Sequence, residues 1–200
     1  MSTIRTRTAS RPARLGGAVP VVVLVAVMWV SEIIDTAMPF LRLDYFGIRP
    51  RDLEGLPGIV FSPFLHFGFE HLIANTTALL VLGALVAWTT RHLLTVSLGV
   101  ILLGGLGVWL LGGANTIIIG ASGLVYGYIA FLLVYGFTVR RFVPVLAAIL
   151  VGVLYGGAVW GLLPIHPGVS WQAHLFGALA GVLLALQLGR RDRPVKRFVG

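Results

Sequence analysis

The chain has 200 residues, of which 58% are hydrophobic and only 11% are charged, and its mean hydropathy is +0.96. This composition lies outside the range of soluble domains and is typical of an integral membrane protein. The net charge of +8 could suit a nucleic-acid-binding protein, but the basic residues flank apolar segments without an aromatic platform, so no nucleic-acid partner is expected. The sequence has no cysteine, which excludes disulfides, thiol catalysis and thiolate metal sites.

Six apolar segments are long enough to cross a membrane, since about 20 residues at roughly 1.5 Å per residue cover about 30 Å of hydrocarbon. They are residues 18–39, 71–90, 93–112, 117–139, 142–163 and 171–188. The sequence therefore predicts an all-α membrane bundle of six helices over 18–189, with basic tails at 1–17 and 190–200. We expect the first segment to be an uncleaved signal anchor. The longest connection, 40–70, combines prolines with short apolar runs and is expected to lie in the membrane interface.

The charges predict how the bundle is oriented, because Lys and Arg in short loops stay on the cytoplasmic side. With six spans, one side receives the basic residues at both chain ends and between spans two and three and spans four and five: Arg5, Arg7, Arg11, Arg14, Arg91, Arg140, Arg141, Arg190, Arg191, Arg193, Lys196 and Arg197. Every acidic residue except Asp192 lies on or near the other side. Both termini are therefore predicted to be cytoplasmic.

Polar residues occur at one depth in three of the spans. In this topology the second, fourth and sixth spans run from outside to inside, and each carries polar residues early: His71 and Asn75, Ser122, and His174. A polar or ionisable group at membrane depth costs free energy unless it faces the bundle interior or a wet cavity, so such residues indicate a functional site.

These residue types suit nucleophilic hydrolysis of a peptide bond. The Ser122 hydroxyl needs a base to become a nucleophile, and His174 can accept that proton and later return it to the leaving amine. The backbone N–H of Ser122, with the side chains of His71 and Asn75, could stabilise the oxyanion. No metal or other cofactor is required.

Small residues around the candidate pair predict close helix packing. Gly120 and Gly123 leave space around Ser122. Two stripes of small residues, Gly123 with Gly127 and Ala173 with Gly177 and Gly181, should bring the fourth and sixth spans together and carry His174 toward Ser122.

The motifs of these three spans resemble the rhomboid intramembrane serine proteases over most of the membrane domain. The matching segments are His66-Phe67-Gly68-Phe69-Glu70-His71-Leu72-Ile73-Ala74-Asn75, Gly120-Ala121-Ser122-Gly123-Leu124-Val125-Tyr126, and Ala173-His174-Leu175-Phe176-Gly177 continuing to Gly181. The resemblance implies a six-helix core and a Ser122–His174 dyad without an acid. It also implies an oxyanion hole lined by His71 and Asn75, and support of the His174 ring by Tyr126. The chain departs from many relatives in the first connection, where Pro57 and Gly58 replace a Trp-Arg pair.

The resemblance further implies the partners and location: transmembrane protein substrates, cut near the outer membrane face, and membrane lipids. We expect a multi-pass protein of a prokaryotic plasma membrane. A substrate helix must unwind to expose a carbonyl, so helix-weakening residues near the cut should favour cleavage. The connection 164–170, which contains His166 and Pro167, could cap the site.

Other interpretations remain open. A serine in a glycine-rich helix is usually a packing residue, and a lone intramembrane histidine is structural about as often as it is functional. A zinc protease would use His66, Glu70 and His71, but their H-x-x-x-E-H spacing fits neither H-E-x-x-H nor H-x-x-E-H. A transporter predicts an internal repeat, which we do not find. A catalytically inactive rhomboid-like protein that binds helices is the remaining alternative.

Overall fold

The computed structural model describes residues 15–165 and 168–194, and every regular element in this part of the chain is helical. The long helices are α1 (Val19–Ala37), α3 (Phe69–Thr89), α4 (Leu93–Leu111), α5 (Ser122–Val139), α6 (Phe142–Tyr155) and α7 (Trp171–Asp192). A 3-10 helix, η6 (Gly156–Leu162), extends α6, so that six segments are long and apolar enough to cross a membrane. The predicted six-helix architecture is confirmed.

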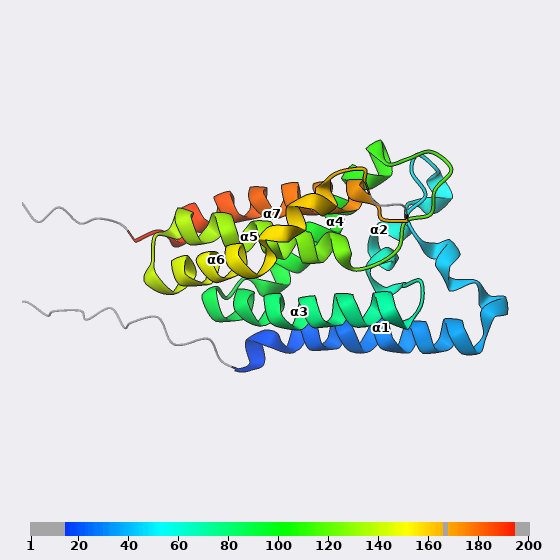
Figure 1. The fold of residues 1–200 in the computed structure, drawn as a ribbon, viewed down its shortest axis with the longest axis horizontal. Helices are drawn as coiled ribbons and strands as arrows, with labels where there is room; N and C mark the ends of the chain where they lie inside the picture. Colours follow the sequence, from blue (N-terminus) through cyan, green and yellow to red (C-terminus); the bar gives the residue numbers. More distant parts are fainter. Residues whose placement is uncertain (1–14, 166–167, 195–200) are drawn as a thin grey trace, which may run out of the picture.

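Helix α5 lies in the middle of the bundle, where it packs against α7, α6, α3 and α4, while α1 packs against α3 at one edge (Figure 1). It is the most buried of the six spans. Two large aromatic side chains of α5, Tyr128 and Phe131, are fully buried, and the Tyr128 hydroxyl lies 2.6 Å from Ser97 Oγ on α4. This central position fixes the N-terminus of α5 relative to the neighbouring helices.

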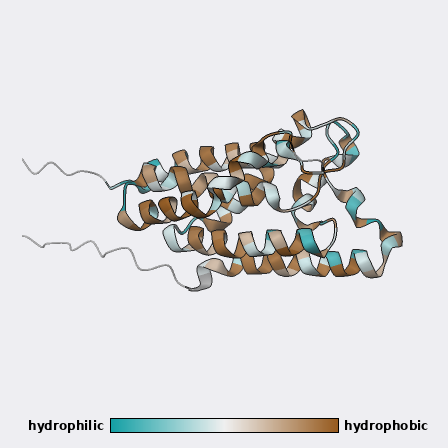
Figure 2. Ribbon diagram, viewed as in Figure 1, coloured by the Kyte–Doolittle hydropathy of each residue, from teal (hydrophilic) through white to brown (hydrophobic). Residues whose placement is uncertain are grey.

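The outer surface of the helices is apolar along most of their length, as the brown bands of Figure 2 show. Large side chains that are more than half exposed occur on several of the spans, among them Val22, Ile73, Leu94, Val153 and Leu183. An apolar exterior of this extent suits a lipid environment, in which helices need not hide hydrophobic side chains.

The fourth span begins at Ser122, later than the predicted start at residue 117. Gly120 has a φ of +113°, which an α-helix cannot accommodate, so the chain turns sharply just before the helix. Before that turn, Ile118 forms an isolated antiparallel bridge with Ile48, with both N···O distances at 2.9 Å. Apolar composition over 117–121 indicated helix, but these residues are apolar because they are packed against the first connection.

The first connection folds into short turns against the C-terminal end of α4. These turns are η2 (Pro39–Leu41), η3 (Leu43–Phe46), η4 (Leu53–Gly55), α2 (Gly58–Phe61) and η5 (Ser62–Phe64), and one further 3-10 turn, η1 (Leu15–Ala18), precedes α1. The indole N–H of Trp109 donates to the Asp52 carbonyl at 2.8 Å, and the Arg51 N–H donates to the Trp109 carbonyl at 2.9 Å. A Cβ at Gly58 would overlap the backbone of Gly47, so glycine permits this close contact. The connection is thus anchored to α4, and its depth in a membrane stays a prediction.

The start of α1 and the end of α7 lie at the same end of the bundle (Figure 1). This agrees with an even number of spans, and the cytoplasmic location of that end stays a prediction from the charges. Residues 1–14 and 195–200 of the predicted tails, and His166 and Pro167 of the predicted cap, lie outside the described residues.

Candidate active site

Ser122 is the first residue of α5, and a glycine turn positions it there. A Cβ on Gly120 would lie 2.7 Å from Cε1 of His71, and the positive φ of Gly120 disfavours any other residue. The Gly120 N–H donates to the Ser62 carbonyl at 2.9 Å, which ties the turn to η5. The turn therefore places Ser122 at a helix N-terminus, where the first backbone N–H groups have no acceptor within the helix.

His174 lies in the first turns of α7 with its imidazole buried between α5 and η6. Its Nε2 is 2.9 Å from Ser122 Oγ, and its Nδ1 is 2.8 Å from the carbonyl oxygen of Gly161. A carbonyl only accepts, so Nδ1 carries the hydrogen and donates to Gly161. In the neutral ring Nε2 is then the acceptor, and the Ser122 hydroxyl donates to it. This is the protonation state that a general base needs.

Helices α5 and α7 approach closely because glycines face each other along their contact. A Cβ on Gly177 would overlap the Gly123 carbonyl, and one on Gly181 would overlap the Gly127 carbonyl. A Cβ on Gly123 would lie 3.2 Å from the Ala173 carbonyl oxygen, immediately before His174. The packing predicted from the two stripes of small residues is confirmed, and it brings the serine and the histidine together.

Tyr126 stacks on His174, with ring centroids 4.0 Å apart and an interplanar angle of 7°. The Tyr126 hydroxyl donates to the Ala158 carbonyl of η6 at 2.8 Å. The imidazole is therefore held on one face by an aromatic ring and at Nδ1 by a backbone carbonyl, both connected to η6.

Gly161 is a site residue that the sequence analysis missed. An added Cβ there would overlap the Tyr126 hydroxyl and lie 3.2 Å from His174 Nδ1. The residue acts through its carbonyl and through the lack of a side chain, so no functional group in the sequence indicates it. The only available signal is the glycine-rich stretch that contains it.

His71 and Asn75 lie on α3, and His71 is next to the Gly120 turn. The His71 ring is in contact range of Gly120, whereas Asn75 is buried and donates one amide N–H to the His71 carbonyl at 3.2 Å. Within residues 15–165 and 168–194, neither side chain is hydrogen bonded to Ser122 or His174. The structure thus brings His71 beside the Gly120 turn, which precedes Ser122. It leaves the second amide N–H of Asn75 available for another acceptor.

His66 is the most buried histidine of the described chain, with 1% of its surface exposed. Its ring packs edge-on against that of His71 at 5.1 Å between centroids. Burial, together with the nearby His71, lowers the pKa of His66 to about 4, so the ring stays neutral near pH 7. Glu70, the acid of the zinc alternative, is exposed, so it does not converge with the buried His66 on a metal position.

The site and the fold together are those of a membrane protein with six apolar helices and a serine–histidine pair near one end of the bundle. Residues 54–191 match the rhomboid domain, and the chain belongs to the rhomboid family, which includes serine proteases. Uncharacterized proteins of Mycobacterium tuberculosis and Mycobacterium bovis are each 41% identical over 207 residues, covering 96% of this chain and 85% of theirs. An uncharacterized protein of Mycobacterium leprae is 37% identical over 200 residues, covering 96% of this chain and 79% of its own length.

Proposed function

We propose that this protein is an intramembrane serine endopeptidase that cleaves transmembrane segments of single-span membrane proteins near the outer membrane face. The observation that carries the proposal is the 2.9 Å contact between Ser122 Oγ and His174 Nε2, with Nδ1 held by the Gly161 carbonyl. This arrangement provides a nucleophile, a base in the required tautomer and a group that orients the base. Membership of a family that includes serine proteases supports the same activity.

In the first step, Ser122 Oγ attacks the carbonyl carbon of the scissile bond while His174 Nε2 accepts the hydroxyl proton. The imidazolium keeps its Nδ1 hydrogen on the Gly161 carbonyl and then donates the Nε2 proton to the leaving amine. The amine departs and an ester to Ser122 remains. A water molecule next loses a proton to Nε2 and attacks the ester carbonyl. As the bond to Ser122 breaks, Nε2 returns this proton to Ser122 Oγ, which releases the acid product and restores both the serine and the neutral histidine.

The tetrahedral intermediates carry a negative charge that needs hydrogen-bond donors. The Ser122 N–H at the start of α5 is one candidate, because the helix N-terminus also has a partial positive charge. The second N–H of Asn75 and the His71 ring beside Gly120 are the others. Each such donor typically contributes about 3 kcal/mol to transition-state stabilisation.

A transmembrane substrate fits this site because the exterior of the bundle is apolar and Ser122 lies at the first residue of α5, near one end of a span. The substrate helix would unwind locally, since an intact helix keeps its carbonyls in backbone hydrogen bonds. The proposal includes a plasma-membrane location, which six candidate spans and bacterial relatives support. The dyad needs no cofactor.

The two alternative functions differ in what they require of the dyad. A catalytically inactive helix-binding protein does not need a serine hydroxyl that is hydrogen bonded to a buried histidine. This chain has both groups, in contact with each other. A transporter would be expected to use polar residues along a permeation path, and family membership argues against it.

The direct test is cleavage of a model single-span substrate by the full chain in liposomes, without added metal. Wild type should cut the substrate, and both Ser122→Ala and His174→Ala should lose roughly 10⁴-fold or more of the rate, because nucleophile and base act as one unit. A fluorophosphonate probe should also label Ser122 in the wild type, and mass spectrometry of the labelled peptide would locate it.

Ser97→Ala is the matched control, because it removes a buried hydroxyl that contacts Tyr128 rather than His174. This variant should keep its activity. Equal cutting by Ser122→Ala and wild type would reject the mechanism, whereas a folded wild type that neither cuts nor takes up the probe would favour the helix-binding alternative.

A further inference from the structure

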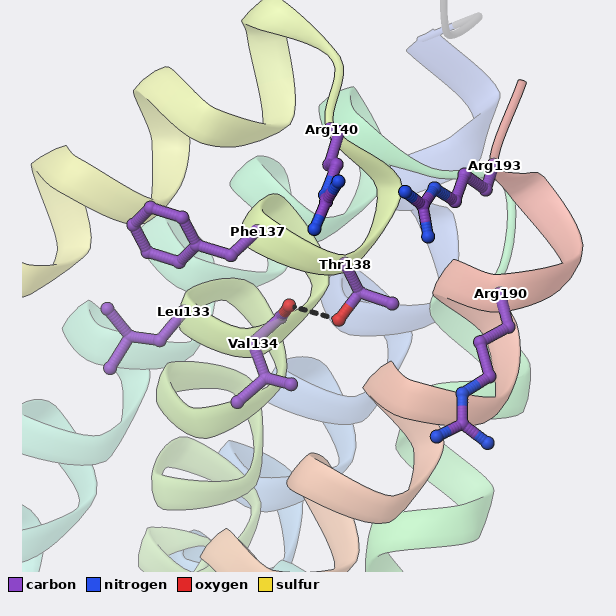
Figure 3. Close-up of a pocket in the computed structure, with 7 residues that line it drawn as sticks. All are labelled: Leu133, Val134, Phe137, Thr138, Arg140, Arg190 and Arg193. Atoms are coloured by element: carbon purple, nitrogen blue, oxygen red, sulfur yellow. Dashed lines mark hydrogen bonds between the residues drawn. The ribbon is translucent and has the colours of Figure 1, made fainter. Parts of the chain in front are cut away.

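A hollow lies between the C-terminal ends of α5 and α7 (Figure 3), at the opposite end of these helices from Ser122 and His174. Its volume is about 490 Å³, within the range of small-molecule sites. The lining residues are Leu133, Val134, Phe137, Thr138, Arg140, Arg190 and Arg193. We call this hollow the arginine groove.

The groove has a charged rim and an apolar wall. Arg140 and Arg193 approach the space above Thr138 from two sides, and Arg190 lies earlier on α7 (Figure 3). The wall is formed by α5, where Phe137 is 61% exposed and Leu133 lies about one turn further from the helix end. The Thr138 hydroxyl donates to the Val134 carbonyl at 2.7 Å, so the arginines are the donors that remain for a ligand.

No carboxylate within residues 15–165 and 168–194 forms an ion pair with these three arginines. Asp192 is the one acidic side chain of the whole sequence at this end of the bundle. Its Oδ2 is bound by His92 Nε2 at 3.1 Å and by the Tyr135 hydroxyl at 2.8 Å. The sequence outside the described residues contains no Asp or Glu. The positive rim is therefore not neutralised by any acidic side chain of the chain.

The arginines are brought together by specific backbone features. A Cβ on Gly189 would lie 2.8 Å from the Thr138 side chain, so glycine lets α7 lie close against the end of α5. Arg140 caps α5 with a φ of 54°, a conformation that usually belongs to glycine or asparagine. Membrane orientation alone requires arginines near this end, and it requires neither their convergence on one hollow nor an arginine in a left-handed cap.

We propose that the arginine groove binds one anionic phospholipid, with its phosphate between Arg140 and Arg193 and the start of an acyl chain along Phe137 and Leu133. Guanidinium groups are suited to phosphate oxygens, because their N–H groups form paired, charge-assisted hydrogen bonds. Basic hollows between membrane helices on the cytoplasmic side favour anionic headgroups. The apolar wall distinguishes a lipid from free phosphate, which has no group to place there.

The test uses the purified full chain in a neutral detergent, titrated with phosphatidylglycerol and examined by native mass spectrometry. One phosphatidylglycerol should remain bound, and phosphatidylcholine should bind about tenfold more weakly because it has no net charge. Arg140→Gln with Arg193→Gln should weaken phosphatidylglycerol binding by about tenfold or more. Inorganic phosphate in excess should not displace the lipid.

The control pair is Arg91→Gln with Arg191→Gln, which removes the same charge at the same end of the bundle from residues that do not line the groove. It should bind phosphatidylglycerol as the wild type does. Equal loss in both pairs would show general charge attraction and overturn the proposal, as would unchanged binding in both. Displacement by inorganic phosphate would identify a free-anion site instead.

Because a substitution in the α5 cap can also unfold the protein, Arg190→Gln serves as a second variant within a regular helix. It should weaken lipid binding while the thermal midpoint without lipid stays that of the wild type. Unchanged lipid binding in folded Arg190→Gln and Arg193→Gln single variants would reject the groove as the site. None of these measurements depends on proteolysis, so the outcome is independent of the proposed function.

Discussion

His174 is oriented by a backbone carbonyl, where many serine hydrolases use a carboxylate. In a membrane bundle this has a physical advantage, because a buried carboxylate would carry a large desolvation cost. The Gly161 carbonyl is neutral and still selects the tautomer with hydrogen on Nδ1. The Tyr126 ring, stacked at 4.0 Å, limits rotation of the imidazole.

Gly161→Ala should reduce proteolysis on the order of 100-fold, because the new methyl group would displace Tyr126 and the His174 ring from the serine. The loss is expected in kcat more than in KM, since the change affects the base and not the path of the substrate. Initial rates over a range of substrate concentrations would separate the two constants.

Gly157→Ala is the control for this substitution, because it lies in the same 3-10 helix and its added Cβ would have no atom within 4 Å. It should behave as the wild type does. If both alanine variants lose activity equally, the flexibility of η6 matters and the contact with the ring does not.

The contact between α5 and α7 joins the two halves of the dyad. Ser122 is carried by the first helix and His174 by the second, and facing glycines set the distance between their axes. A helix contact as closely packed as this one tolerates little added volume, so a methyl group placed in it must move one of the two helices.

Gly181→Ala should destabilise the bundle by about 1–3 kcal/mol, because its Cβ would overlap the Gly127 carbonyl. We also expect slower proteolysis, since a shift of α7 carries His174 with it. Thermal unfolding in detergent and substrate cleavage would measure the two effects.

Gly152→Ala on α6 is the matched control variant for Gly181→Ala. Its added Cβ would make an ordinary 3.7 Å contact with Leu133, so it should be close to neutral in both measurements. Equal midpoints for the two variants would contradict the inference that the α5–α7 contact is tightly packed.

The charge distribution of the whole molecule predicts its orientation in the membrane. The arginine groove lies at the end of the bundle where α1 starts and α7 ends, and Ser122 and His174 lie near the starts of α5 and α7, toward the other end. The positive-inside rule then predicts that the groove lies in the cytoplasmic leaflet and the dyad near the outer face.

Single cysteines would test this orientation without removing any native thiol, because the sequence has none. Ala114→Cys lies between α4 and α5, and Pro194→Cys follows α7, both at exposed positions. A membrane-impermeant maleimide should label Ala114→Cys in intact cells and Pro194→Cys only after lysis. The opposite pattern would reverse the bundle and place the arginine groove in the outer leaflet.

The sequence alone determined the membrane class, the six spans and the two residues of the candidate dyad. Hydropathy depends on each segment separately, and Ser122 and His174 carry their chemistry in their own side chains. The glycine stripes also predicted a real contact, because small residues act through their size wherever two membrane helices meet.

Only the tertiary structure decided how these parts meet. The role of Gly161, the start of α5 at Ser122 and the convergence of Arg140 with Arg193 all depend on segments far apart in the chain. Every residue has a backbone carbonyl, so the sequence cannot show which one will hold a histidine. Apolar residues occur in membrane helices and in packed turns alike, so the sequence cannot show where α5 begins. Their functions follow from which neighbours the folded chain brings to them.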